Sequence, residues 1–197
     1  MIIGLTGSIA TGKSTVSEYL LSKGYPLVDL DKIARLVVEK GQDTLEEIAS
    51  AFGTEVLLPS GDLNRAALGE IVFSDEQARK ELNAITHPAI AFEMKRQIRA
   101  YEKDGRSLIF CDVPLLFEGD LKESFDLVWL VYIPEDLQLQ RLMSRDLIDE
   151  TTAKKKMDSQ LSIEVKKSLA DIVIDNSDSK EKTYMQIDKY LASTGLC

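Results

Sequence analysis

Short apolar runs alternate with amphipathic stretches along the chain. The apolar runs span residues 1–6, 25–30, 107–112, 126–133 and 171–175. Each is nearly continuous in hydrophobicity, which is typical of a strand buried on both faces rather than one with a solvent-facing side. Strands of this kind, separated by helices, predict an α/β fold with a five-stranded parallel sheet covered on both faces.

Helical periodicity fills the spaces between these runs. It is most extended between the second and third strands, where residues 32–104 carry little strand signal. This placement predicts a helical subdomain inserted at the carboxyl edge of the sheet, where α/β proteins bind ligands. Helices are expected at 15–24, 32–39, 43–53, 64–73, 74–85, 88–104, 135–145, 150–160, 162–169 and 180–192.

Several helix starts carry local signals. Asp31 directly precedes the helix at 32–39 and is expected to be its N-cap. Asp43 and Glu46 have the spacing of a capping box at the start of the next helix. A new helix is expected to begin at Pro88, since proline is favoured in the first turn.

The stretch between the first strand and the first helix fits G-x-x-x-x-G-K-[ST], the phosphate-binding P-loop. It is Gly7-Ser8-Ile9-Ala10-Thr11-Gly12-Lys13-Ser14, followed by Thr15. The glycines allow close approaches that a Cβ would block, so the loop amides can converge on phosphate oxygens at a helix N-terminus. Lys13 is expected to reach the β- and γ-phosphates, and the Ser14 hydroxyl to ligate Mg²⁺. An ordinary glycine turn is the alternative, which the flanking strand and helix disfavour.

Composition narrows the classes of partner. The net charge of −9 argues against a nucleic-acid polymer, although a local basic pocket can still bind a small anion. No apolar run is long enough to cross a bilayer, and no basic segment precedes the first strand, so no membrane association is expected. Cys111 and Cys197 make no disulfide framework, which favours a reducing cytoplasm.

Three carboxylates lie at or near the carboxyl ends of predicted strands. Asp29 and Asp31 end the second strand, and residues two apart share a face in an extended segment. Either can accept a proton from an attacking hydroxyl or help to hold Mg²⁺. Asp112 ends the third strand as a Walker-B-type acid does, and a plain strand-end turn residue is its alternative.

Basic side chains supply further candidates. Arg141 and Arg145 are one helical turn apart, so they can face a transferring phosphoryl group or form an exposed, ion-paired face. Arg65 is a candidate anion ligand or a surface ion pair. His87 is the only histidine, which disfavours a zinc site and leaves a hydrogen-bonded packing residue or a substrate contact. The lysines at 154–156 and 166–167 are expected to be solvated.

These residues belong to an ordered set of segments that resembles the dephospho-CoA kinase family along nearly the whole chain. Each segment is modest alone, and the set at family spacing is specific. The segments are Ile3–Gly7 with Lys13-Ser14, Val28–Arg35, Leu63–Leu68, Leu82–Ile90 and Asp112–Glu118.

The resemblance implies a fold, a reaction and partners. It implies a P-loop kinase core at 1–30, 107–134 and 165–197, a helical CoA-substrate domain at 31–106, and a small helical lid at 135–164. It implies transfer of the ATP γ-phosphate to the ribose 3′-hydroxyl of dephospho-CoA, the last step of coenzyme A synthesis. ATP and dephospho-CoA are the implied partners, Mg²⁺ is the implied cofactor, and a monomer or weak homo-oligomer is expected in the cytoplasm.

The resemblance also assigns roles. Asp31 matches the general base, and Lys13 and Ser14 match the phosphate and Mg²⁺ residues. Arg141 resembles a lid arginine, with Arg145 close behind it. The segment ending at Asn176 resembles the late strand and loop near the adenine. The substrate side is matched by Asp31, Arg35, Arg65, His87, Asp112, Pro114, Leu115 and Leu116.

The chain departs from the family in its loop, where Ser8 and Ala10 replace two glycines. Neither is a defining position of the general motif, so phosphate binding is expected to survive. A nucleoside monophosphate kinase, which shares the helical insert, is the alternative enzyme. A guanine-nucleotide switch is disfavoured, because the sequence lacks an N-K-x-D motif.

Overall fold

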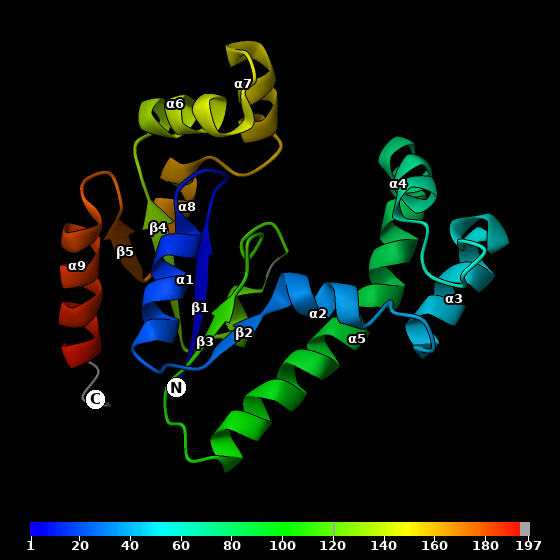
Figure 1. Ribbon diagram of the computed structural model, residues 1–197, viewed down its shortest axis with the longest axis horizontal. Coiled ribbons are helices and arrows are strands. Elements are labelled where there is room, and N and C mark those ends of the chain that lie inside the picture. Colours follow the sequence, from blue (N-terminus) through cyan, green and yellow to red (C-terminus); the bar gives the residue numbers. More distant parts are fainter. Residues whose placement is uncertain (120, 194–197) are drawn as a thin grey trace. The chain divides into compact units, whose positions relative to one another are not determined.

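The computed structural model describes residues 1–119 and 121–193. It contains a five-stranded parallel sheet in the order β2-β3-β1-β4-β5 (Figure 1). The predicted α/β fold with five parallel strands is therefore confirmed. The strands are β1 (Ile2–Gly7), β2 (Leu27–Asp29), β3 (Ile109–Asp112), β4 (Leu127–Tyr132) and β5 (Ile172–Asp175).

The chain divides into two compact units. The first comprises Met1–Asp29 and Tyr101–Cys197 and contains the sheet, and the second comprises Leu30–Ala100. The helices of the first unit are α1 (Lys13–Ser22), α6 (Glu135–Asp146), α7 (Glu150–Asp158), α8 (Ile163–Leu169) and α9 (Lys180–Ser193), with a short 3₁₀ turn at Lys122–Ser124.

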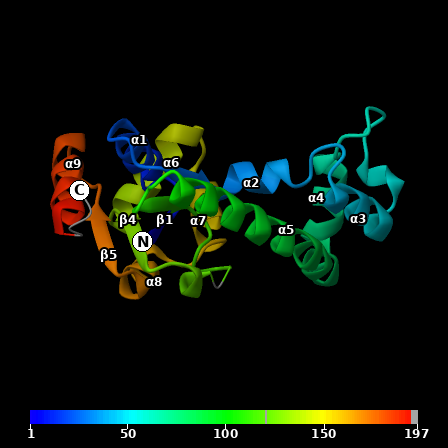
Figure 2. The same ribbon diagram turned by 90° about the horizontal axis from the view of Figure 1, so that it is seen from below.

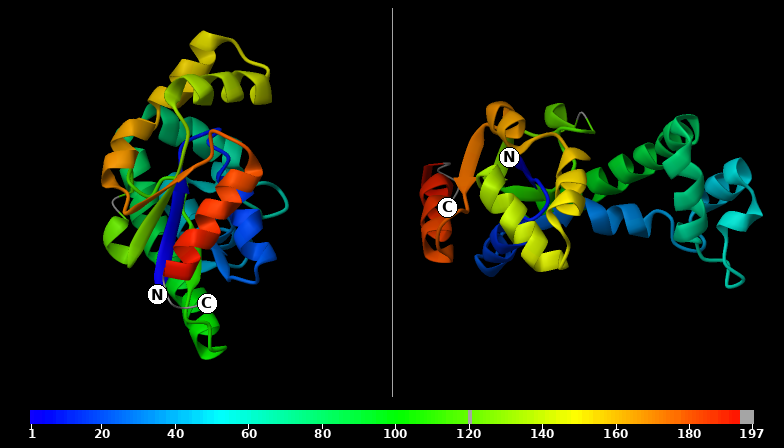
Figure 3. Two further views of the ribbon diagram at one scale, coloured as in Figure 1. Left: turned by 90° about the vertical axis from the view of Figure 1, so that its left-hand side faces the viewer. Right: turned by 90° about the horizontal axis from the view of Figure 1, so that it is seen from above.

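The strands of the first unit are buried on both faces, as their continuous hydrophobicity predicts. Successive side chains alternate between faces, so Trp129 and Val131 of β4 lie on one side, whereas Leu130 and Tyr132 lie on the other. The first face packs against α1 and α9, and the second packs against Ile163 of α8. Figure 3 shows α1 and α9 on one side of the sheet and α8 on the other.

The second unit is helical. It holds α2 (Leu30–Leu36), α3 (Asp43–Phe52), α4 (Arg65–Ser74) and most of α5 (Glu76–Lys103), which are labelled in Figure 2. A 3₁₀ turn at Thr54–Val56 follows α3. Its buried apolar side chains include Leu45, Ile48, Val56, Leu68 and Met94.

The predicted break before Pro88 is wrong, because α5 runs through it as one helix. Proline removes one N–H from the ladder and so frees the carbonyl of Ala84. Ala84 and Pro88 are both exposed, so water can satisfy that carbonyl and the cost is reduced. The Thr86 hydroxyl also donates to the Leu82 carbonyl at 2.8 Å, which supports the turn before Pro88.

Both predicted acidic caps are wrong. The chain passes from Asp29, the last residue of β2, directly into α2 at Leu30, so Asp31 lies in the first helical turn. Asp43 is the first residue of α3, and Gln42 before it is the N-cap without a side-chain hydrogen bond. Both acids still favour their helices, because a negative charge is stabilised near a helix N-terminus.

The prediction that Lys166 is solvated is also wrong. Its side chain is 0% exposed, and its ammonium lies 2.7 Å from the Glu118 carboxylate. The same carboxylate accepts the Leu161 N–H at 3.1 Å. Lys167 lies over the Tyr132 ring at 3.9 Å. The other lysine run is solvated as predicted: Lys154 pairs with Glu150 on the exposed face of α7.

No helix among the described residues is both long enough and apolar enough to cross a membrane.

The contact between the buried Lys166 and the more accessible Glu118 leads to a stability prediction. Glu118→Ala should lower the free energy of unfolding by about 3 kcal/mol, because it leaves the Lys166 ammonium buried without a partner. The double variant Glu118→Leu/Lys166→Met should be close to the parent, since both charges are then gone. Urea unfolding measures each value. Glu123→Ala, at an exposed glutamate, is the control. If Glu118→Ala loses no more unfolding free energy than Glu123→Ala, the proposed role of the Lys166–Glu118 contact is contradicted.

Candidate active site

The P-loop motif joins β1 to α1, as predicted. Gly7 ends β1, and Lys13 begins α1 after Gly12 as N-cap. A Cβ on Gly7 would lie 2.6 Å from Thr11 Oγ1, and one on Gly12 would lie 2.2 Å from Asn176 Nδ2. Gly12 also has a φ of +84°, which favours glycine. Both glycines are therefore required by the shape of the loop.

Ser8 and Ala10, the two loop positions expected to differ from the family pattern, have distinct environments. Ala10 has a φ of +62°, a left-handed conformation that costs a side-chain-bearing residue about 1–2 kcal/mol. Ser8 is 7% exposed, and among the described residues its hydroxyl has no hydrogen-bond partner. Ala10 thus takes a glycine-like backbone shape without glycine's freedom, so its surroundings must hold it there.

Asn176, which directly follows β5, supports the loop by hydrogen bonds. Its side-chain Nδ2 donates to the Thr11 carbonyl at 2.8 Å, and its Oδ1 accepts from the Thr183 hydroxyl at 2.9 Å. The residue is 6% exposed, and both ends of its amide are used within the protein. The Asn176 side chain therefore positions the loop, and its backbone is also bonded within the protein, because its N–H donates to the Tyr132 carbonyl at 2.9 Å.

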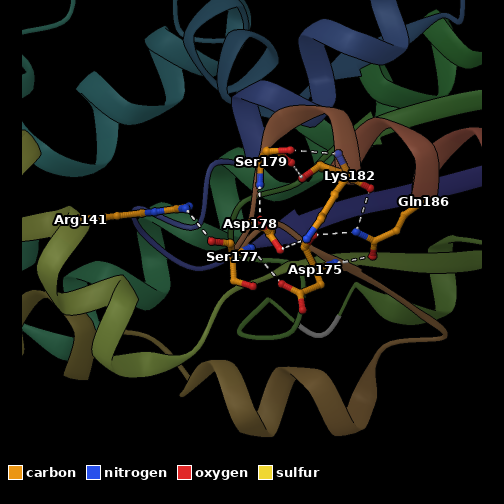
Figure 4. Close-up of polar contacts among 8 residues, drawn as sticks. Arg141, Asp175, Ser177, Asp178, Ser179, Lys182 and Gln186 are labelled. Atoms are coloured by element: carbon orange, nitrogen blue, oxygen red, sulfur yellow. Dashed lines mark hydrogen bonds and ion pairs between the residues drawn. The ribbon is translucent and has the colours of Figure 1, made fainter.

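Arg141 on α6 reaches the connection between β5 and α9 (Figure 4). Its guanidinium donates to the carbonyls of Asn176 at 3.1 Å and Ser177 at 3.5 Å. That connection is itself fixed, because the Ser177 N–H donates to the Asp175 carboxylate and Gln186 donates to the Asp175 carbonyl. Lys182 pairs with the Asp178 carboxylate and lowers its pKa.

Arg145 has a different environment from Arg141. It is exposed and forms an ion pair with Asp146 at 2.8 Å. Hydrogen bonds from Arg145 and Lys156 lower the pKa of the Asp146 carboxyl to about 2. The alternative of an ion-paired helix face thus describes Arg145, whereas Arg141 bonds to backbone carbonyls.

A cation and a carboxylate meet at the carboxyl edge of the sheet. The Lys13 ammonium contacts Asp112 Oδ1, and the Ser17 hydroxyl donates to Asp112 Oδ2 at 2.9 Å. Asp112 is 9% exposed, so both of its oxygens are used in a nearly buried site. Asp29 is the register partner of Asp112 on the neighbouring strand, which puts a second carboxylate at the same edge.

The apolar segment after β3, residues 114–116, packs against β1. Leu116 is fully buried, and a Cβ on Gly4 would lie 2.6 Å from its Cδ1. Leu115 is 50% exposed, and the Pro114 carbonyl accepts from the Thr6 hydroxyl at 3.3 Å. Leu116 thus fixes the segment, and Leu115 and Pro114 are the members left near the surface.

The remaining candidates lie in the second unit. Asp31 and Arg35 are one turn apart on α2, and both are exposed. Arg35 also lines a cavity of about 350 Å³ between α2 and Gln97 of α5. Arg65 begins α4 and His87 lies on α5; both are exposed and without an ion pair among the described residues. The packing alternative for His87 and the ion-pair alternative for Arg65 are therefore wrong.

Cys111 lies within β3 and is fully buried. Burial raises the pKa of its thiol to about 12, so it is not a reactive group at neutral pH. Cys197 lies outside the described residues.

Sequence reasoning missed four residues that contact the motif or its partners. Ser17 lies one turn beyond Lys13, so helical spacing could have placed it on the same face. The other three leave no local signal: two glutamines reach the loop across long sequence separations, and Thr183 acts on the loop only through Asn176. They are Gln138, Gln160 and Thr183.

The loop geometry leads to a comparison between two glycines. Gly12→Ala and Gly24→Ala both put a Cβ at a positive φ, +84° and +83°, at a cost of about 1–2 kcal/mol each. Nothing lies within 4 Å of the Gly24 Cβ, whereas the Gly12 Cβ would displace Asn176. Gly12→Ala should therefore lose distinctly more unfolding free energy in urea. Equal losses would contradict the proposed contact.

Comparison with known proteins gives a consistent result. The family model described as "Dephospho-CoA kinase" (CoaE) matches residues 1–182. A dephospho-CoA kinase of Shouchella clausii is 48% identical over 98% of both chains, and one of Listeria monocytogenes serotype 4b is 46% identical over 94% of this chain and 92% of its own.

Solved structures agree. A dephospho-CoA kinase from Campylobacter jejuni has a TM-score of 0.75 and 34% identity over 98% of this chain and 96% of its own. Shikimate kinase from Acinetobacter baumannii shares only the fold, with a TM-score of 0.53 and 17% identity over 100% of this chain and 95% of its own. The family match covers most of the sequence, and on this ground the chain belongs to the dephospho-CoA kinase family.

Proposed function

We propose that the chain transfers the γ-phosphate of ATP to the ribose 3′-hydroxyl of dephospho-CoA at the loop Gly7–Ser14. Membership of the family supplies the reaction: the chain is a dephospho-CoA kinase that acts in coenzyme A synthesis. The observation that carries the site is the contact of Lys13, at the start of α1, with the Asp112 carboxylate at the sheet edge. The family match favours this reaction over the alternative of a nucleoside monophosphate kinase.

The loop is suited to a triphosphate. The first N–H groups of α1 have no acceptor within the helix. Such groups, at the N-terminus of a helix, stabilise a bound anion. Lys13 contacts Asp112, and we propose that it turns to the β- and γ-phosphates when ATP binds. The exchange keeps the ammonium paired in both states, which limits its cost.

Mg²⁺ fits the donors at this edge. Ser14 is exposed in the first turn of α1, and Asp112 supplies a nearby carboxylate. Among the described residues no group of three His, Cys, Asp or Glu side chains could form a complete metal cage. This is compatible with Mg²⁺, which typically takes only one or two protein carboxylates together with phosphate oxygens and water. When bound, it would neutralise phosphate charge.

Acceptor recognition is assigned to the second unit. Asp31 is exposed in the first turn of α2, and we propose it as the general base for the 3′-hydroxyl. Arg35, Arg65 and His87 are proposed to contact the acceptor, because each is exposed and the two arginines suit its phosphates.

In the first unit, Pro114 and Leu115 are proposed to touch the acceptor, with Leu116 anchoring them from the core. Arg141 is proposed to stabilise charge on the transferring group, and the Asn176 backbone to lie near the adenine. Arg145 is proposed to assist once it is released from Asp146. The core, substrate-domain and lid roles, the cytoplasmic location and the monomeric or weakly associating state remain predictions.

One assay tests both the reaction and its site. The protein is incubated with ATP, Mg²⁺ and dephospho-CoA, and ADP and the 3′-phosphorylated product are followed. Lys13→Ala should reduce kcat at least ~100-fold with the fold retained, since it removes a charge that acts on the transferring group. Lys154→Ala, an exposed lysine of α7, is the control. Turnover of AMP without turnover of dephospho-CoA would contradict the proposed reaction. Near-parental rates in Lys13→Ala would contradict the proposed site.

Asp31 is tested against Asp43, which also lies exposed in the first turn of a helix. Asp31→Asn should lower kcat by roughly 100-fold or more, because a general base contributes at least this factor. ATP affinity should be unchanged. Asp43→Asn should lose only the helix-dipole contribution, about 0.5 kcal/mol of stability, which Asp31→Asn shares. If both variants lower stability and neither lowers kcat, Asp31 only stabilises its helix and is not the general base.

A further inference from the structure

Ile9, in the middle of the phosphate loop, is held from both sides by glutamine side chains. Its N–H donates to Gln160 Oε1 at 2.9 Å, and its carbonyl accepts from Gln138 Nε2 at 2.8 Å. Gln138 lies on α6 and is 2% exposed, and Gln160 follows the end of α7 and is half-buried. We call Gln138 and Gln160 the glutamine clamp.

Each clamp bond fixes the direction of one peptide plane. In a trans peptide the C=O and the following N–H point in opposite directions. Gln160 takes the Ile9 N–H, so the Ser8 carbonyl points the other way, where it accepts from Thr11 N at 3.2 Å and Thr11 Oγ1 at 2.9 Å.

The second clamp bond acts on the next peptide plane in the same way. Gln138 takes the Ile9 carbonyl, so the Ala10 N–H must point away from α6. That N–H has no acceptor among residues 1–119 and 121–193. A free, oriented N–H in a phosphate loop is the group that an anion uses.

The loop depends on these bonds because it is not packed tightly here. Ser8 and both clamp residues line a cavity of about 260 Å³ between the loop and the helices α6 and α7. Ala10 directly follows the clamped residue, and its φ of +62° is a shape that alanine does not adopt without support. The clamp supplies that support.

We propose that Gln138 and Gln160 are positioning residues that hold the Ala10 N–H toward the phosphates of ATP. This rests on the proposed role of the loop in binding those phosphates. Because the two glutamines lie at opposite ends of the segment that holds α6 and α7, the clamp also couples the loop to both helices.

The test uses four clamp variants in the full-length protein. Gln138→Met and Gln160→Met each remove one bond at similar side-chain length. Each should raise the KM for ATP about tenfold and leave the KM for dephospho-CoA unchanged, because a lost buried hydrogen bond is worth roughly this factor. Gln140→Met makes the same change on the exposed side of α6 and should match the parent.

The glutamate variants separate hydrogen bonding from charge. Gln160→Glu keeps an acceptor for the Ile9 N–H, so its KM for ATP should return to within about threefold of the parent. Gln138→Glu, assayed at pH 8, adds the same charge without a donor and should not recover. Parental KM values for ATP in both methionine variants would overturn the clamp, as would equal changes in the KM of both substrates.

Lys13→Ala is assayed beside them to separate the two proposals. If Lys13→Ala is inactive while the methionine variants are normal, only the clamp fails. If Lys13→Ala stays active, the loop is not the phosphate site and the proposed site fails first.

Discussion

Parallel pairing of β1, β2 and β3 is the constraint on which the site depends. It brings the end of β1, where the loop begins, beside Asp112 and Asp29 at one edge of the sheet. The Lys13–Asp112 contact follows directly from that register, because α1 begins where the loop returns from β1. A parallel sheet thus gathers a cation and two carboxylates at one edge.

The loop has bonds of its own from Thr11 to the Ser8 carbonyl, and it also depends on side chains from distant elements. Asn176 holds the Thr11 carbonyl from the β5–α9 connection, and the glutamine clamp holds Ile9 from the α6–α7 segment. Arg141 links the same two regions, because it lies on α6 and donates to the Asn176 carbonyl. Residues far apart in sequence therefore converge on one loop, which makes its shape a property of the whole first unit.

The sequence predicted the parts of the fold that local pattern controls. Continuous apolar runs identified all five strands, because strands buried on two faces require them. Pro88 was misjudged because its cost depends on whether the freed Ala84 carbonyl meets water, which is a tertiary fact. Lys166 was misjudged for the same reason, since its partner Glu118 lies in a distant loop. Roles assigned by resemblance placed Asn176 near the nucleotide but could not show that its side chain holds Thr11.

The alanine at position 10 of the loop has a physical explanation in these supports, whereas nothing in the structure explains Ser8. A glycine at position 10 would reach a φ of +62° without strain, but it would also sample other shapes. Alanine has fewer backbone conformations than glycine in the unfolded or open loop. The loop therefore loses less conformational entropy when it orders, provided that its ordered shape is held by other contacts. The strain of about 1–2 kcal/mol at Ala10 is then offset by bonds at the preceding residue, Ile9. The substitution and the clamp are therefore best understood together, since a stiffer loop is useful only where its shape is imposed from outside.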